Sequence, residues 1–176
     1  MSAGEPAGMR LFCYGTLMDP DVRALVLGRA CPEAVPARLA GWRRVRVPGE
    51  AYPVVMPDPL GSVAGLLVRL EGEAELDRVR FFEGVSFRLR QFPVESLGGG
   101  TKLAWVAAPA AEHPSEEGPW DLGLWSPHRE AYLAATAAYM AAYGTVDVAE
   151  IHLVWQAHGN GRAQPPGLAG IISEAD

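Results

Sequence analysis

The sequence predicts an α+β fold: a small mixed β-barrel, or a curled sheet, with helices on its outside. Apolar runs of strand length recur through residues 9–108, while only two or three segments have helical spacing. The two kinds of segment do not alternate as strand–helix–strand units, the pattern that would predict a parallel sheet. The 176 residues are enough for one domain with a core of its own.

The predicted strands are apolar runs bounded by glycine and proline. They cover residues 9–14, 35–47, 51–56, 63–70, 87–96 and 102–108. Pro57-Asp58-Pro59 and Gly61 separate the third strand from the fourth, and Gly98-Gly99-Gly100 between the last two is a hairpin signal. The strand over 35–47 carries several arginines, which predict a solvated face or, less simply, a contact with an acidic partner.

Two helices are predicted within this region. The first covers residues 19–27, with Asp19 at the N-cap, Pro20 at the first helical position and Gly28 just past the end. The second covers residues 73–82, where Leu76 and Val79 recur at helical spacing.

The C-terminal part reads as a linker followed by a helical extension. Proline, glycine and glutamate dominate residues 109–119, and a long helix is predicted over 126–143, ending at Gly144. Its stripe of Tyr132, Tyr139 and Tyr143 predicts packing against a core; a protein that works as an adaptor through this helix would instead expose it. Residues 151–155 fit either a helix or a strand.

Two features suggest an acyl-transfer site. Residues 14–17 (Tyr-Gly-Thr-Leu) lie between a strand and a helix start, where backbone N–H groups without partners suit a carboxylate or an oxyanion. Glu83 lies among Phe81, Phe82, Val85 and Phe87, which would raise its pKa toward neutrality and suit it to proton transfer. The pattern alone also fits a surface glutamate at a helix end capped by Gly84.

Composition excludes several other classes. The formal charge of −6 argues against a general nucleic-acid binder, and no apolar run is long enough to span a membrane. Cys13 and Cys31 form no metal motif, the four histidines lack ligand spacing, and Ser86 and Ser126 lack the context of a hydrolase nucleophile. Residues 1–10 lack the apolar segment of a signal peptide, so a protein of a reducing cytoplasm is the expectation.

Four short motifs together resemble the γ-glutamylcyclotransferase-like family, the superfamily that also holds the plant avirulence-induced-gene proteins. They are Tyr14-Gly15-Thr16-Leu17, Tyr52-Pro53, Gly65-Leu66-Leu67 and Leu76…Phe82-Glu83-Gly84…Phe87-Arg88. Their order and spacing identify residues 9–108 as the family's domain. The remainder, 109–176, is similar to a C-terminal helical extension of some bacterial members and is expected to pack on that domain.

The resemblance implies the γ-glutamylcyclotransferase fold, a barrel with flanking helices, and an enzyme without metal or organic cofactor. Its substrate would be a small molecule, a γ-glutamyl amine or peptide, which cyclises to 5-oxoproline and releases the amine. Glu83 would be the general acid/base. The residues implied in substrate binding are Tyr14, Gly15, Thr16, Leu17, Tyr52 and Phe87. From the residues alone, Tyr52 equally fits a packed aromatic side chain.

Two positions depart from the family pattern. Members often carry an aspartate shortly before the glutamate and a tyrosine after it, whereas this chain has Arg80 and Phe87, so a hydroxyl near the substrate is lost. These departures keep a second class open: a catalytically inactive relative that binds a small carboxylate or a protein partner. Neither the leaving amine nor the oligomeric state follows from the sequence.

Overall fold

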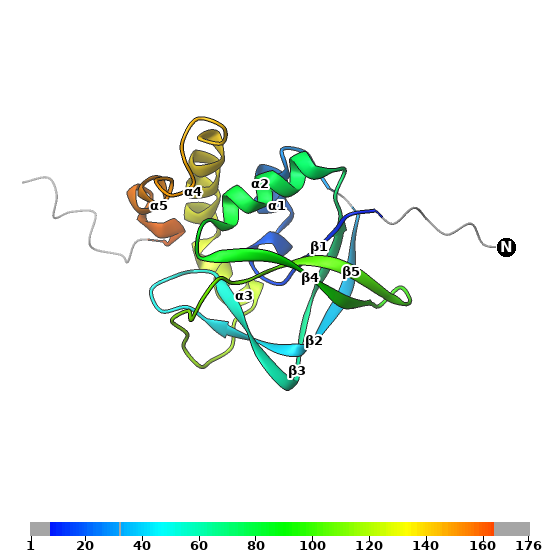
Figure 1. Cartoon of the computed structure of the whole chain (residues 1–176). Helices are drawn as coiled ribbons and strands as arrows, with labels where there is room; N and C mark the ends of the chain where they lie inside the picture. The colour runs from blue at the N-terminus through cyan, green and yellow to red at the C-terminus, as the bar shows by residue number, and fades with distance from the viewer. Residues whose placement is uncertain (1–7, 32, 164–176) are drawn as a thin grey trace, which may run out of the picture.

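Five strands close into a barrel in the computed structural model, which describes residues 8–31 and 33–163 (Figure 1). They are β1 (Arg10–Cys13), β2 (Ala34–Arg46), β3 (Pro53–Arg69), β4 (Phe87–Ser96) and β5 (Thr101–Pro109). Their order around the barrel is β1-β3-β2-β4-β5, and the parallel pair of β1 and β5 closes it while the other pairs are antiparallel. The predicted α+β barrel is confirmed.

The helices gather mostly on one side of the barrel (Figure 1). They are α1 (Pro20–Leu27), α2 (Glu73–Glu83), α3 (Leu122–Trp125), α4 (Arg129–Ala141) and α5 (His152–Ala157), with 3-10 turns η1 (Thr16–Met18), η2 (Ser126–His128) and η3 (Gly159–Gly161). None of the described helices has the length and apolar character needed to cross a membrane. The first helix begins as predicted, because the Asp19 carboxylate accepts hydrogen bonds from the amides of Asp21 and Val22.

The prediction of separate strands over 51–56 and 63–70 is wrong, because β3 is continuous from Pro53 to Arg69. Its antiparallel partner β2 runs alongside it for most of that length, and a shift of register between Ala40 and Trp42 absorbs the prolines. Residues 58–61 bulge outward there, leaving Leu60 98% exposed. The break in the sequence pattern is therefore a bulge in one strand.

The predicted helix over 126–143 is divided. The Asp121 carboxylate caps the short α3, Pro127 lies in the 3-10 turn η2, and α4 begins only at Arg129. Proline is tolerated at the start of a helical turn because its position needs no amide hydrogen bond, and here the turn that holds it is a 3-10 turn. Of the two alternatives for 151–155, the helix is correct, as α5; residues 164–176 of the predicted extension lie outside the described residues.

Two of the four arginines of β2, Arg43 and Arg46, have acidic partners in the segment predicted as a linker. Arg46 forms an isolated β-bridge with Glu116, and its Nη2 lies 3.5 Å from the Glu116 carboxylate. Arg43 Nη1 lies 2.5 Å from Glu117 Oε1. These pairs are exposed and contribute little to stability individually, yet they join the 109–119 segment to the barrel wall.

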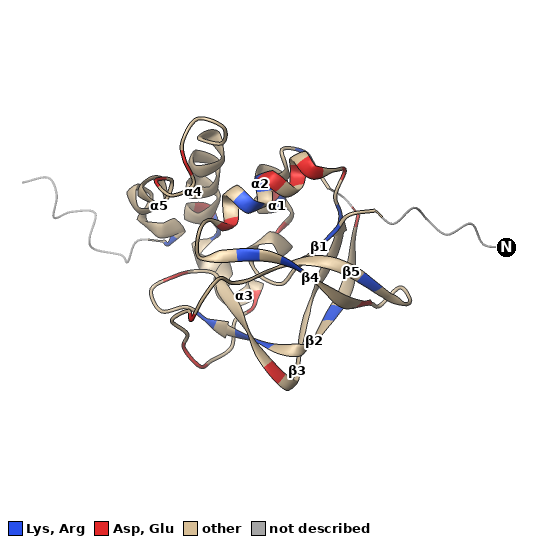
Figure 2. Cartoon of the chain, viewed as in Figure 1, with Lys and Arg blue, Asp and Glu red and all other residues tan. Residues whose placement is uncertain are grey.

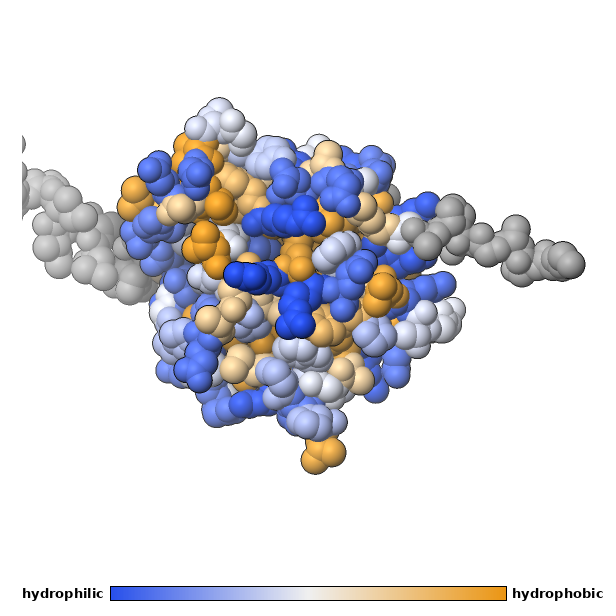
Figure 3. Space-filling model, in the orientation of Figure 1, coloured by the Kyte–Doolittle hydropathy of each residue, from blue (hydrophilic) through white to orange (hydrophobic). Residues whose placement is uncertain are grey.

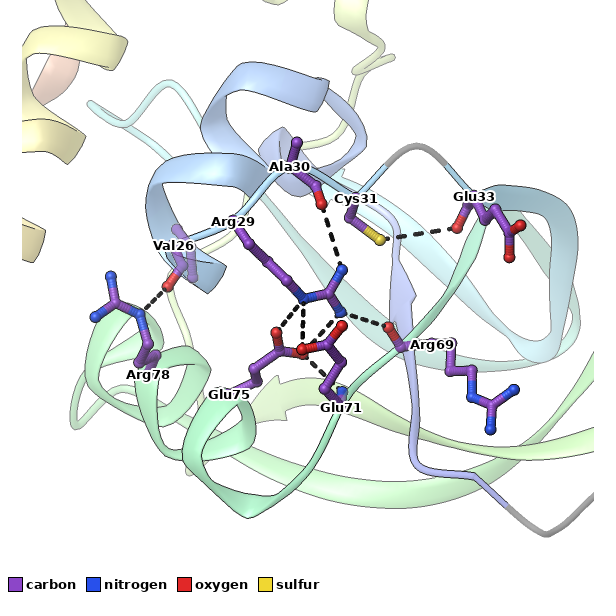
Figure 4. A network of polar contacts seen from close by, with 9 residues as sticks. All are labelled: Val26, Arg29, Ala30, Cys31, Glu33, Arg69, Glu71, Glu75 and Arg78. Carbon is purple, nitrogen blue, oxygen red and sulfur yellow. Dashed lines mark hydrogen bonds and ion pairs between the residues drawn. The ribbon is translucent and has the colours of Figure 1, made fainter.

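A polar network fixes α2 against the end of α1 (Figure 4). Arg29 forms an ion pair with Glu75 and lies 3.5 Å from the Glu71 carboxylate, and Arg78 Nε donates to the Val26 carbonyl over 2.7 Å. Together with the buried contacts of Val22, Val26, Leu76 and Val79, this network sets the position of α2. The C-terminal end of that helix, where Glu83 lies, is thereby held relative to the segment before α1.

Candidate active site

A cavity of about 340 Å³ opens where β1 ends, between the barrel and the helices. It is at the lower end of the size range of small-molecule sites. The residues that the sequence predicts for the site all line it: Tyr14, Gly15, Thr16, Leu17, Tyr52, Glu83 and Phe87. Glu83 therefore faces a cavity and not bulk water, in contrast to the surface-glutamate alternative.

The segment from Tyr14 to Met18 is held from several sides. The Tyr14 hydroxyl donates to the Ala107 carbonyl over 2.6 Å, and Arg44 Nη1 donates to the Tyr14 carbonyl over 2.9 Å. Buried Arg23 donates to the Leu17 carbonyl over 3.0 Å. These contacts fix the backbone on both sides of the turn, so its amides keep one orientation.

Two glycines let the strands approach closely at this turn. A Cβ at Gly65 would lie 2.3 Å from the Cys13 carbonyl oxygen, a distance no side chain tolerates. A Cβ at Gly15 would lie 3.1 Å from the Pro53 ring. Glycine is needed at position 65 of β3, because a residue without a side chain lets the end of β1 lie against the barrel.

The amides of Gly15, Thr16 and Leu17 donate no hydrogen bond to any residue that the structure describes. The next amides are used, since Met18 N–H donates to Gly15 O and Asp19 N–H to Thr16 O, both over 3.0 Å. Three neighbouring donors beside a cavity fit an anionic group, either a carboxylate or an oxyanion.

Glu83 is the last residue of α2, and Gly84 ends the helix with φ of 70° and ψ of −166°, a conformation that glycine alone adopts readily. The Glu83 carboxyl forms neither a hydrogen bond nor an ion pair with any described residue. Loss of solvation in the cavity raises its pKa from 4.5 to about 7. An acid with this pKa both accepts and donates protons near neutral pH.

The effect of Glu83 on its neighbours shows how closely they surround it. Burial raises the pKa of Tyr14, Tyr52, Tyr132 and Tyr139, and the Glu83 carboxylate raises each one further. These hydroxyls therefore remain protonated at neutral pH and can donate hydrogen bonds. Burial, more than the nearby carboxylate, likewise raises the pKa of the Cys13 thiol to about 12, so Cys13 is inert.

The C-terminal part of the chain forms one wall of the cavity, which the sequence analysis did not predict. Tyr132 and Tyr139 are core residues as expected, but both also line the cavity, together with Ile151 and Trp155. The Thr16 hydroxyl donates to the Tyr132 hydroxyl over 3.0 Å, and the Tyr139 hydroxyl donates to the Phe81 carbonyl over 2.7 Å. The sequence did contain a signal for this placement: a buried tyrosine hydroxyl needs a polar partner, so tyrosines on a buried stripe indicate a polar site beside it. The stripe is mostly covered, which contradicts an exposed adaptor surface.

The two departures from the family pattern have different consequences. Arg80 does not line the cavity; its guanidinium lies over the Trp105 ring, 5.9 Å from the centroid. Phe87 does line it, packed against Tyr52 with ring centroids 6.1 Å apart, and carries no hydroxyl. Asp77, the earlier carboxylate on α2, accepts a hydrogen bond from Tyr143 over 2.8 Å and lies outside the cavity lining.

Other chemistry finds little support in the described part of the chain. It contains no cluster of three or more histidine, cysteine or carboxylate side chains able to hold a metal ion. Ser126 donates to the Gly123 carbonyl within the chain. Ser86 lines the cavity, but it has no hydrogen-bonded base of the kind a serine nucleophile requires.

Comparison with known proteins identifies the family. Residues 11–126 match the family described as "Gamma-glutamyl cyclotransferase, AIG2-like", and the chain belongs to it. AIG2-like protein C of Arabidopsis thaliana is 31% identical over 140 residues, which cover 76% of this chain and 79% of that protein. Protein AIG2 C of the same plant is 25% identical over 182 residues and covers both chains in full. The resemblance seen in the sequence is confirmed.

A solved structure supports the fold independently. The solution structure At3g28950.1 from Arabidopsis thaliana is similar with a TM-score of 0.59 and 22% identity, and the match covers the whole of both chains. At this identity the likeness shows the fold and not the activity.

Proposed function

We propose that this chain is a γ-glutamylcyclotransferase that converts a γ-glutamyl amine or peptide to 5-oxoproline and a free amine. The observation that carries the proposal is one cavity lined by both an isolated carboxyl, Glu83, and three unpaired amides, those of Gly15, Thr16 and Leu17. Membership of the family described as "Gamma-glutamyl cyclotransferase, AIG2-like" supports the same reaction class.

The reaction begins when the Glu83 carboxylate takes a proton from the α-ammonium group of the substrate. The freed amine attacks the γ-carbonyl carbon of the same molecule, and a five-membered ring closes. The bond between that carbon and the leaving nitrogen then breaks as Glu83 returns the proton to this nitrogen. The ring nitrogen passes its second proton through the Glu83 carboxylate to the departing amine, so the products are the neutral lactam of 5-oxoproline and an ammonium ion. Because nucleophile and carbonyl are tethered, holding a folded conformer supplies much of the rate enhancement.

The amides of residues 15–17 stabilise negative charge on the substrate. They donate hydrogen bonds either to its α-carboxylate or to the oxyanion of the tetrahedral intermediate. Tyr52 and Phe87 form an apolar wall beside the reacting atoms, which keeps water from them and sustains the raised pKa of Glu83.

The test compares Glu83→Gln with Glu73→Gln on a panel of γ-glutamyl amines and peptides, with 5-oxoproline as the measured product. Both substitutions remove a carboxylate from α2, but Glu73 is exposed and lies outside the cavity. We expect Glu83→Gln to lower kcat about 100-fold or more, the usual contribution of a general acid or base, and Glu73→Gln to match the parent. Equal turnover by Glu83→Gln and the parent would contradict the role of Glu83 as general acid and base.

The alternative of a catalytically inactive relative is supported by Phe87, which leaves the rim without the hydroxyl common in the family. It predicts that the parent binds 5-oxoproline or glutamate yet releases no 5-oxoproline from any substrate in the panel. Calorimetric titration alongside the product assay separates the two functions.

A further inference from the structure

The wall of the cavity formed by the C-terminal part of the chain is aromatic and aliphatic. Trp155 packs edge-on against Tyr132 and Tyr139, with ring centroids 5.0 and 5.9 Å apart. Ile151 is 1% exposed beside them, and Val148 completes the wall at 36% exposure. The Trp155 ring lies nearly perpendicular to both tyrosine rings, so it fixes this wall in a defined shape.

Positive charge is missing from the cavity lining. All 15 lysines and arginines fall within the residues that the structure describes, and none of them lines the cavity. Most of them lie on the outside, for example on β4, where Figure 2 marks basic positions and Figure 3 shows a hydrophilic surface; buried Arg23 instead bonds the Leu17 carbonyl. The only lining side chain able to become cationic is His152, which is exposed and whose Nδ1 lies 2.9 Å from the Ala149 carbonyl.

This charge distribution disfavours a leaving amine that carries a carboxylate. Such a group would lose water against apolar side chains without a cation to replace it, and Glu83 would repel it. In the proposed reaction the glutamyl part of the substrate occupies the unpaired amides of residues 15–17, so these donors are not free for a second carboxylate. An apolar amine, in contrast, gains from contact with Tyr139, Val148 and Trp155.

We propose that this wall makes the site specific for γ-glutamyl amides of uncharged, apolar amines and selects against γ-glutamyl amino acids and peptides. This inference rests on the proposed function and narrows its substrate class. Tyr139, Val148 and Trp155 are the specificity-determining residues: they contact the departing amine and leave proton transfer to Glu83.

The test uses a matched pair of substrates, the γ-glutamyl amide of phenethylamine and γ-glutamyl-phenylalanine, which differ only in one carboxylate. At pH 8 we expect kcat/KM for the amide to exceed that for the amino acid by about 30-fold or more, since an unpaired carboxylate is costly to desolvate. Val148→Arg places a cation at the rim and should raise kcat/KM for γ-glutamyl-phenylalanine about tenfold. Leu153→Arg, equally basic but on the outer side of α5, should leave the ratio unchanged.

Calorimetric titration of the same two compounds into Glu83→Gln separates this inference from the proposed function. If Glu83→Gln binds the amide more tightly but the parent releases no product, the cyclotransferase activity is refuted while the proposed preference for apolar amines stands. Similar kcat/KM values for both substrates, or binding of neither compound, would overturn the specificity. Equal effects of Val148→Arg and Leu153→Arg would also count against the wall as its origin.

Discussion

At the scale of single residues, the hydroxyl missing at Phe87 has a counterpart elsewhere in the cavity lining, at Tyr132. Tyr132 lies 116 positions from Thr16 in the chain, yet their hydroxyls are 3.0 Å apart, beside the unpaired amides. Burial raises the pKa of Tyr132, so its hydroxyl is a neutral donor at physiological pH. No local motif joins these residues, which is why the sequence indicated packing alone for Tyr132.

We therefore expect Tyr132→Phe to raise KM about tenfold with a smaller change in kcat, because it removes one hydrogen bond to the charged glutamyl end of the substrate. Steady-state kinetics on an accepted substrate measure both constants. Tyr143→Phe is the control, since that hydroxyl bonds Asp77 outside the cavity lining. Unchanged KM in Tyr132→Phe would mean that its hydroxyl serves only the fold.

At the scale of elements, local signals predict well where one segment determines its own structure. Asp19, Pro20 and Gly28 delimit α1 because capping depends on neighbouring residues alone. The division of β3 was predicted wrongly because Pro57 and Pro59 need not end a strand: residues 58–61 of β3 form a bulge, and pairing with β2 resumes on both sides of it. The cavity wall formed by α4 and α5 was not predicted for the same reason, because it depends on contacts between residues distant in sequence.

The end of α2 offers a test at this scale. Gly84 holds φ of 70° and ψ of −166°, so Gly84→Ala should cost about 1–3 kcal/mol of stability and displace Glu83, lowering kcat. Gly72→Ser at the other end of the helix is the control: its φ of 162° is extended backbone, and a Cβ there meets no atom within 4 Å. Urea unfolding and turnover measure the two effects. Normal kcat in a folded Gly84→Ala protein would show that the helix end need not be fixed.

At the scale of the whole molecule, the barrel closes through the pairing of β1 with β5, at opposite ends of the sheet's sequence. Periodicity predicted the strands and the α+β class, but this closure follows from the curvature of the assembled sheet. Closure brings the end of β1 to the helices, and the cavity forms there. Loss of solvation in this cavity makes the Glu83 carboxyl hard to ionise, so the free energy of unfolding of the whole domain depends on pH.

Because the folded-state pKa of Glu83 is raised from 4.5 to about 7, its contribution favours the folded state below pH 4.5 and is lost as the pH rises through 7. Glutamine resembles the protonated acid, so Glu83→Gln should equal the parent in stability at pH 4 and exceed it at pH 8. The melting temperature should rise by about 2–4 °C for each kcal/mol of relieved charge burial. Thermal unfolding between pH 4 and 8 measures this difference, with Glu73→Gln as a variant expected to follow the parent throughout. A gain at pH 4 as large as that at pH 8 would mean that ionisation of Glu83 is not its source, and the carboxyl would then be too well solvated for the proton transfer proposed for it.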